Sequence, residues 1–240
     1  MGIVRLRAFY EERRRRGPGL LALAIVGLLN WIVSDALSFT AIVSELNIDV
    51  SGFHRVADTL LPDFGLFGLM FVLALGGWLL DWDRLTRAIF FVANSLATFN
   101  VTNYMVDLIF SITRREGNRD AALLLVDAVL VWLMNWIVFS IWFWMLDGGG
   151  PDRRGTPRAR RIEMQFKQQE GGIPGWENWR PGFMDYAFAA FGNSTSLGPN
   201  DVSILSRRFK ILSIVQTMNS LAVIALIAAR AIGLFTTTRG

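Results

Sequence analysis

The segment Asn193–Asp201 reads NSTSLGPND, and its hydroxyl, amide and carboxylate groups are of the kind that line a path for water or ions. It follows the aromatic stretch RPGFMDYAFAAFG, which predicts a helix of roughly ten residues, too few to cross a bilayer. A long apolar segment comes next. Irregular backbone within a membrane is tolerated only where protein buries it or where it faces water. This order predicts either a re-entrant pore loop or a short surface helix in a cytoplasmic loop.

Groups that support other chemistry are scarce in this chain. There is no cysteine, so disulfides, thiolate catalysis and iron–sulfur ligation are excluded. The single histidine, His54, lies in a polar stretch, and a zinc site normally draws on His and Cys together. The Gly-rich stretch DGGGPD lacks the lysine of a phosphate-binding loop. We therefore expect no catalytic residue, no metal site and no cofactor, and a protein that is not an enzyme.

Polar and ionisable side chains interrupt the apolar stretches. The candidate intramembrane polar residues are Asp35, Asn100, Asn103, Asp107, Asp127 and Arg230. Charges at membrane depth are costly and usually face the protein interior or water. Asn100, Asn103 and Asp107 follow the i, i+3, i+7 spacing of one helical stripe, which predicts either a polar path or hydrogen bonds between helices. Asp107 and Asp127 can equally lie near the interface, and Arg230 can pair with an acid or reach the surface.

Composition indicates that a membrane surrounds these residues. Of the 240 residues, 52% are hydrophobic and 18% are charged, and the mean hydropathy is +0.38. The charges gather in short clusters that separate apolar stretches, and a span needs ~20 helical residues. Five such stretches are Gly19–Val43, Phe64–Leu80, Ala88–Ile112, Ala121–Leu146 and Ile211–Phe235. A large soluble core is the alternative interpretation of the same apolar runs.

Basic residues set the expected orientation. The first span is immediately preceded by Arg13, Arg14, Arg15 and Arg16. Lys and Arg are retained in the cytoplasm during insertion, which places the N-terminus inside. The cluster in TRREGNRD argues against this orientation, because it would then lie outside. The four N-terminal arginines are interpreted as a topology anchor or as a site for anionic lipid. Since the basic residues flank the spans, no nucleic-acid partner is expected.

The stretch DYAFAAFGNSTSLGPNDVSILS is similar in register to the pore loop of tetrameric potassium-type channels, in which an aromatic helix and a Thr-rich turn precede the filter TVGYG. Residues 130–235 also resemble an uncharacterised family of bacterial membrane proteins with an ion-channel-like C-terminal half. The resemblance to potassium-type channels implies a homo-oligomer, with a tetramer favoured, whose pore is lined by Asn193, Ser194, Thr195, Ser196, Leu197, Gly198, Pro199, Asn200 and Asp201. In the channel pattern, Thr195 and Ser196 match the threonines that close the pore helix, and Asp201 matches the acid after the filter.

Two residues depart from the filter pattern. Pro199 stands in place of the filter tyrosine, fixes φ near −65° and removes a backbone donor. Asn200 stands in place of the second glycine, although a filter of stacked carbonyls depends on the conformational freedom of glycine. We expect that stringent potassium selectivity is lost. A weakly selective, cation-preferring pore is the first hypothesis, and a non-conducting accessory subunit of a membrane assembly is the second. A transporter or membrane enzyme is the third, but no inverted repeat is evident.

The predicted fold is all-α: a polytopic membrane protein with about five transmembrane helices and a re-entrant pore helix and loop before the last one. The expected regions are a basic cytoplasmic segment (1–18), a four-helix transmembrane region (19–146), a polar basic loop (147–181) and a half-helix with the final span (182–240). The expected location is the inner (plasma) membrane of a bacterium. Five spans put the pore loop on the cytoplasmic side, opposite to potassium channels. Either the loop is inverted, as in glutamate-receptor-type channels, or the N-terminus lies outside, or a span is miscounted near the acidic segment 44–63, where the stretch 53–82 can hide a half-span.

Overall fold

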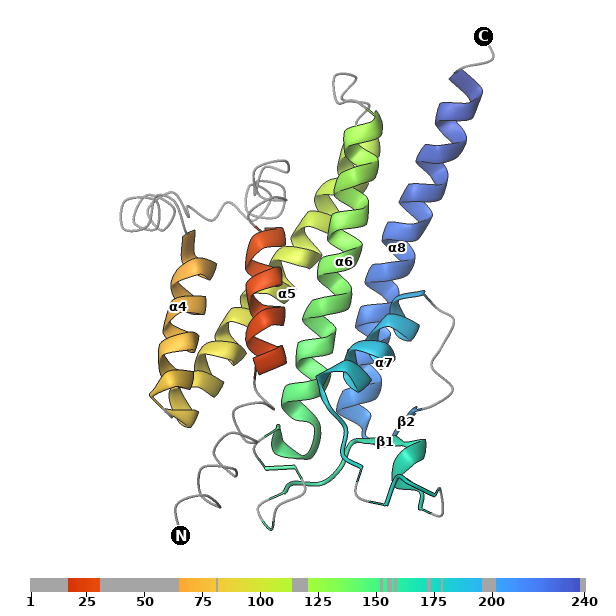
Figure 1. Ribbon diagram of the computed structural model, residues 1–240. Helices are drawn as coiled ribbons and strands as arrows, with labels where there is room; N and C mark the ends of the chain where they lie inside the picture. The colour runs from red at the N-terminus through yellow and green to blue at the C-terminus, as the bar shows by residue number, and fades with distance from the viewer. Residues whose placement is uncertain are drawn as a thin grey trace. The chain divides into compact units, whose positions relative to one another are not determined.

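The computed structural model describes residues 17–30, 65–80, 82–113, 121–151, 153–154, 157, 159–171, 174–177, 179–195 and 202–237. Most of them are helical, which confirms the all-α class (Figure 1). The long elements are an unlabelled helix Gly17–Asn30, α4 (Gly65–Leu79), α5 (Asp83–Thr113), α6 (Ala121–Leu146), α7 (Phe183–Thr195) and α8 (Arg207–Thr237). The short elements are η1 (Asp147–Gly149), β1 (Met164–Phe166), η2 (Lys167–Gln169) and β2 (Val202–Ile204).

The helices α4, α5, α6 and α8 agree with four of the predicted apolar stretches, with two corrections at their starts. The helix Gly17–Asn30 covers only the first part of the stretch Gly19–Val43, and the rest of that stretch lies outside the described residues. α5 begins at Asp83, inside the predicted turn DWDRLTR, because nothing in that turn breaks a helix. α8 begins at Arg207, four residues before the predicted start at Ile211. The reason is local: Ser206 is the N-cap of α8, and its Oγ accepts a hydrogen bond from the Phe209 N–H at 3.3 Å.

A two-stranded antiparallel ladder was not predicted. β1 lies in the segment expected to be an irregular loop, and β2 lies just after the predicted pore segment. Met164 pairs with Ile204 and Phe166 with Val202. Strands of three residues are too short for an alternating pattern to be recognised in sequence. The ladder ties the connection before α7 to the start of α8.

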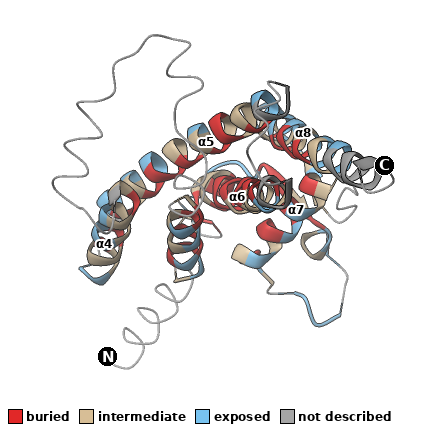
Figure 2. Ribbon diagram, turned by 90° about the horizontal axis from the view of Figure 1, so that it is seen from above, coloured by how far each residue is buried: buried red, intermediate tan, exposed pale blue. Residues whose placement is uncertain are grey.

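Two described helices are long and apolar enough to cross a bilayer, and they lie at Leu125–Gly149 and Arg207–Ala229. α5, with 31 residues, is long enough but too polar to join them. The two differ in cover: 56% of the apolar window in α6 is buried, against 22% in α8. In Figure 2, which views α6 nearly end-on, the helix shows mainly the buried and intermediate colours. The other predicted spans stay predictions, and residues 31–64 lie outside the described part of the chain.

The chain divides into two compact units. Unit 1 comprises Met1–Ala22 and Trp136–Met218, and unit 2 comprises Leu23–Asn135 and Asn219–Gly240. In unit 1 the aromatic side chains of Phe139, Phe143 and Phe209 form a buried cluster, with 5.6 Å between the ring centroids of the last two. In unit 2, α4 packs closely against α5.

Candidate functional site

α7 is a half-length helix whose start is well defined. Its 13 residues extend roughly 20 Å at 1.5 Å per residue, less than a bilayer core of ~30 Å. Pro181 and Gly182 precede it, and the Asp185 carboxylate accepts a hydrogen bond from the Gly182 N–H at 2.7 Å. An acidic side chain in the first turn also interacts favourably with the helix dipole. This local sequence fixes where α7 begins and, with it, where the predicted pore helix starts.

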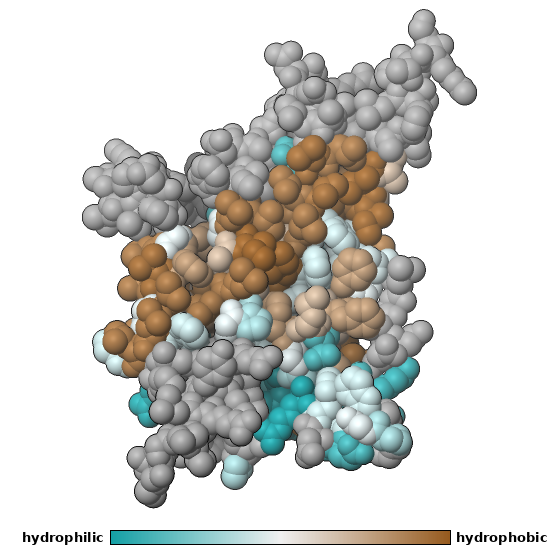
Figure 3. All heavy atoms as spheres, viewed as in Figure 1, coloured by the Kyte–Doolittle hydropathy of each residue, from teal (hydrophilic) through white to brown (hydrophobic). Residues whose placement is uncertain are grey.

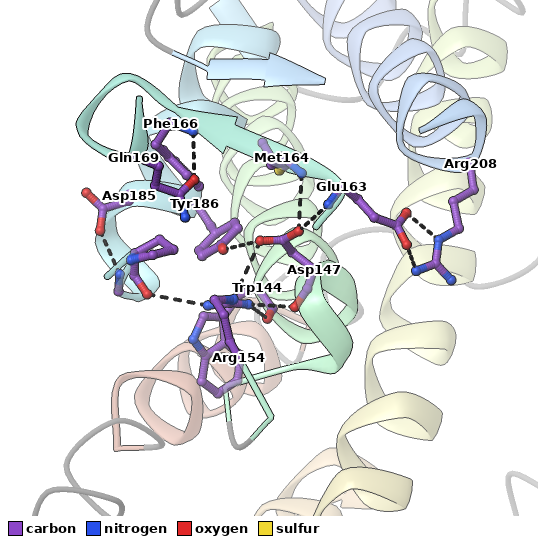
Figure 4. Close-up of polar contacts among 12 residues, drawn as sticks. Trp144, Asp147, Arg154, Glu163, Met164, Phe166, Gln169, Asp185, Tyr186 and Arg208 are labelled. Atoms are coloured by element: carbon purple, nitrogen blue, oxygen red, sulfur yellow. Dashed lines mark hydrogen bonds and ion pairs between the residues drawn. The ribbon is translucent and has the colours of Figure 1, made fainter. Parts of the chain in front are cut away.

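The N-terminal end of α7 is anchored to the end of α6 through Asp147. The buried Tyr186 hydroxyl donates to Asp147 Oδ2 at 2.5 Å. The other carboxylate oxygen, Oδ1, accepts hydrogen bonds from the backbone N–H groups of Glu163 at 2.7 Å and Met164 at 3.2 Å. Burial raises the pKa of Tyr186, against the opposing charge of Arg154, so the phenol remains a donor. One carboxylate therefore joins α6, β1 and α7 (Figure 4).

Arg154 completes this anchor from the opposite side. Its guanidinium is buried and donates from Nη2 to the Trp144 carbonyl at 2.8 Å and the Asp147 carbonyl at 3.0 Å. Nη1 donates to the Pro181 carbonyl at 3.4 Å, just before α7. Nε forms an ion pair with Asp147 Oδ2 at 3.5 Å, and the guanidinium lies 4.6 Å from the Tyr186 ring centroid. The cation satisfies the last carbonyls of α6 and compensates the buried carboxylate.

The sequence after α6 makes this arrangement possible. Gly148, Gly149 and Gly150 have φ values of +61°, +87° and +96°, which residues with a Cβ rarely adopt. The chain therefore reverses immediately after Asp147 and brings Arg154 back beneath the helix end. We refer to Asp147, Arg154 and Tyr186 as the anchor cluster.

A second buried acid ties the same segment to the start of α8. Glu163 accepts a hydrogen bond from Ser206 Oγ at 2.6 Å and forms a bidentate ion pair with Arg208 (Figure 4). Its backbone carbonyl accepts a hydrogen bond from the Leu205 N–H at 2.8 Å. The start of α7 and the start of α8 are therefore held at the same polar end of unit 1. Figure 3 shows hydrophilic side chains gathered around this connecting segment and apolar ones over α8.

The C-terminal end of α7 packs against the middle of α8. Gln216 is fully buried, and its Nε2 donates to the Ala190 carbonyl at 2.7 Å and to Ser194 Oγ at 2.8 Å. Asn193 Nδ2 donates to Gln216 Oε1 and to Ser213 Oγ, both at 3.3 Å. On the other side, Trp136 Nε1 of α6 donates to the Ala187 carbonyl at 2.8 Å. α7 thus lies between α6 and α8 of unit 1 and is held by polar contacts to both.

These contacts define how far α7 extends along α8. Gln216 lies nine residues beyond Arg207, or roughly 14 Å along the helix. β2 is again at the polar end, because it pairs with β1. The chain therefore leaves the polar end along α7, reaches the level of Gln216, and is back at the polar end by Val202. The seven residue steps from Thr195 to Val202 can cover at most about 25 Å, enough for this return.

The structure describes only the first three predicted pore-lining residues. Asn193 and Ser194 face α8, and Thr195 Oγ1 donates to the Phe191 carbonyl of its own helix at 3.1 Å. All three are helical, which corrects the prediction that the irregular segment begins at Asn193. The other predicted pore-lining residues, Ser196, Leu197, Gly198, Pro199, Asn200 and Asp201, lie outside the described residues. That these nine residues line a pore stays a prediction.

The predicted intramembrane polar residues are partly described. Asp35 and the Arg230 side chain lie outside the described part. Asn100 Nδ2 donates to Asn30 Oδ1 at 2.6 Å, an interhelical hydrogen bond of the kind that sequence suggested. Asn103 of α5 is buried and Asp107 is half-buried, so the stripe on α5 faces away from the exposed side of that helix. Asp127, on α6, is also buried. The alternative of a polar path along this stripe is not tested.

Sequence reasoning missed the residues that hold α7 in place. Asp147 was noted only within a Gly-rich turn, and Arg154 is one of many arginines in that segment. Gln216 carried a usable signal, because it is an amide in the middle of an apolar span. Tyr186 and Glu163 gave none, since their partners are far away in sequence.

The arrangement holds oriented polar groups around α7. Among the described residues, no three His, Cys, Asp or Glu side chains lie together as metal ligands would. Comparisons of the chain with protein-family models, with curated proteins and with solved structures found no match. The function must therefore be argued from the geometry of α7 and its surroundings.

Proposed function

We propose that this is a multi-pass membrane protein of the pore-loop type, which forms a weakly selective, cation-preferring channel as a homo-oligomer in the bacterial inner membrane. One observation carries the proposal. α7 is half the length of a span, starts at the polar end of unit 1 and ends beside Gln216, near the middle of the candidate span Arg207–Ala229. A helix that enters to mid-depth and a chain that returns on the same side are the features of a re-entrant pore loop.

The direction of α7 supports a preference for cations. Its C-terminal end, at Thr195, carries the partial negative charge of the helix dipole. That end lies roughly 14 Å along α8, about half of a bilayer core. In an oligomer, the dipoles and a ring of Asp201 carboxylates would attract cations to the same axis.

The surface of α8 supports self-association within a bilayer. Its exposed apolar side chains follow helical spacing, as in Ile211, Ile214, Met218 and Leu221. These side chains remain uncovered in a single chain, and lipid or a second copy would cover them. The N-terminal arginines Arg13 to Arg16 are proposed to hold the chain to anionic lipid at the membrane surface.

A non-conducting accessory subunit is the second candidate, and a different observation favours it. Ser194 and Gln216 are both fully buried and bonded to each other, so this end of α7 is closed against its own α8. Pro199 also replaces a residue that a carbonyl filter would need. Such a protein would retain the re-entrant fold without a conducting path.

The first experiment tests the re-entrant path of the chain. Because the chain has no cysteine, single-cysteine variants need no altered background. We expect that Glu170→Cys and Arg207→Cys, both exposed, react with an impermeant maleimide from the same side of sealed vesicles. Reaction from opposite sides would mean that the chain crosses the membrane between them, and the pore-loop proposal would be wrong.

The second experiment tests conduction. Purified protein in liposomes is assayed by cation flux and single-channel recording, with Asp201→Asn and Thr195→Ala as variants. We expect currents whose conductance or cation preference changes in both variants, with Glu170→Ala as an exposed control. Currents that are unchanged in both variants would remove the segment from the lining. No current in the wild type, with same-side labelling retained, would favour the accessory subunit.

A further inference from the structure

The connecting segment before α7 contains a pocket that the pore-loop proposal does not use. Its volume is about 400 Å³, within the range of small-molecule sites. Its lining includes Gln168 and Gln169 of η2 together with Trp176, Glu177 and Trp179. These residues lie outside both candidate membrane spans.

The indole rings of Trp176 and Trp179 both line the pocket and lie at an angle to each other. Their ring centroids lie 6.1 Å apart and the ring planes meet at 62°. A turn holds them together, since the Trp179 N–H donates to the Trp176 carbonyl at 3.1 Å. Phe166 of β1 packs edge-on against Trp179 with 5.7 Å between centroids, which fixes that ring from behind. Trp176 remains 44% exposed, so its ring is available to a ligand.

A carboxylate lies between the two rings in the sequence. Glu177 Oε1 accepts a hydrogen bond from the Gly175 N–H at 3.0 Å. Hydrogen bonds from the backbone N–H groups of Glu177 and Gly175 lower the pKa of this carboxyl, so it is ionised at neutral pH. Gly175 has a φ of +88°, a conformation that glycine adopts without strain. The local turn thus presents a negative charge beside the aromatic walls.

We propose that this pocket binds a small organic cation, a primary or quaternary ammonium compound. Indole faces attract cations through their quadrupole, and several aromatic faces around one site are the usual means of recognising quaternary ammonium groups. Glu177 supplies the opposite charge. The inference does not rest on the proposed pore, because it uses only residues of the connecting segment. The ammonium group can belong to a free amine or to a lipid headgroup, and the experiment separates these sources.

The test uses the full-length protein in maltoside micelles, titrated with choline and followed by calorimetry and tryptophan fluorescence. We expect saturable binding of choline and none of 3,3-dimethyl-1-butanol, its uncharged isostere. Trp176→Ala should weaken choline binding about tenfold, in line with the strength of a cation–π contact. Glu177→Gln should weaken it about threefold, in line with the strength of an exposed ion pair. Both side chains are exposed, so neither change should prevent folding. Trp82→Ala, which removes another exposed tryptophan that lies outside the pocket, should bind choline as the wild type does.

Two further outcomes decide the matter. Equal binding of choline and its uncharged isostere, or equal losses in Trp176→Ala and Trp82→Ala, would overturn the proposal. Titration is then repeated in nanodiscs of phosphatidylcholine and of phosphatidylglycerol. Weaker choline binding in phosphatidylcholine discs would support a site occupied by lipid headgroups, and equal binding in both would support a site for a free amine.

Discussion

In unit 1 the ends of the helices are joined by buried charged side chains, whereas two of the helix contacts in unit 2 are made by small residues and amides. Asp147, Arg154 and Glu163 are each less than a tenth exposed, and each has a partner of opposite charge or several backbone donors or acceptors. In unit 2 the corresponding contacts are the close approach of Gly77 to Thr86 and the hydrogen bond from Asn135 Nδ2 to Ser220 Oγ at 2.8 Å.

The difference follows from what each region must fix. In the proposed membrane setting, lipid is as apolar as a leucine side chain, so the helices of unit 2 would gain little from apolar contact alone and would rely on close packing and weak hydrogen bonds. A half-length helix has a further requirement, because its ends must be held at defined depths. Buried charges with several partners hold the helix ends in place, at the cost of removing the charges from water. The comparison predicts that substitutions at the buried charges of unit 1 lower the free energy of unfolding more than substitutions at the helix contacts of unit 2.

The largest effect is expected for Asp147→Ala. The change removes the acceptor of the Tyr186 hydroxyl and of two backbone N–H groups and leaves Arg154 buried without its carboxylate. We expect a loss of about 3–5 kcal/mol in the free energy of unfolding. The measurement is reversible unfolding of the purified protein in mixed micelles. Glu170→Ala, an exposed acid in the same segment, is the control and should change stability by less than about 0.5 kcal/mol.

Asp147→Asn sharpens this result. An amide keeps one acceptor oxygen but adds donors and loses the charge that compensates Arg154. We therefore expect Asp147→Asn to lower the free energy of unfolding, but by less than Asp147→Ala does. A full loss with Asn would assign the effect to charge, and no loss with either variant would show that the anchor cluster does not determine the position of α7.

A smaller effect is expected in unit 2 for Gly77→Ala. A Cβ at this position would lie 2.6 Å from Thr86 Oγ1, so either the Thr86 side chain must leave its hydrogen bond to the Trp82 carbonyl or α4 and α5 must separate. We expect a loss of about 1–3 kcal/mol, typical of overpacking. Gly76→Ala is the matched control, because a Cβ there has nothing within 4 Å and the substitution should stabilise the helix slightly. Recovery of stability in Gly77→Ala/Thr86→Ala would show that the loss comes from this contact.

The smallest effect is expected for the amide contacts of unit 2. Asn135 is hydrogen-bonded to Ser220, and its Oδ1 accepts a bond from Asn219 Nδ2 at 3.4 Å. A double-mutant cycle with Asn135→Ala and Ser220→Ala should give a coupling of about 0.6 kcal/mol, the average for hydrogen bonds between membrane helices. A coupling as large as the Asp147→Ala loss would remove the distinction between the two units.

The sequence predicted the helices well where apolar runs were long. α4 and α6 begin and end within one residue of the predicted stretches, because charges and glycines border them on both sides. The short aromatic helix was also predicted, since Pro181 and Gly182 mark its start. Its end was misjudged: Asn193, Ser194 and Thr195 were expected to form a polar loop but are helical. Asn193 and Ser194 are bonded to α8, and Thr195 Oγ1 donates to the Phe191 carbonyl of its own helix. Tertiary hydrogen bonds there outweigh the weak helix propensity of these residues.

The sequence by itself determined the helical class, the apolar stretches and the presence of a half-length helix before the last one, because these depend on composition and on neighbours along the chain. Only the tertiary structure decided which polar residues hold that helix. Asp147 and Tyr186 are 39 residues apart, and Glu163 and Arg208 are 45 apart. A single sequence carries no record of such distant pairs, since their contact energy is realised only when the intervening chain has folded.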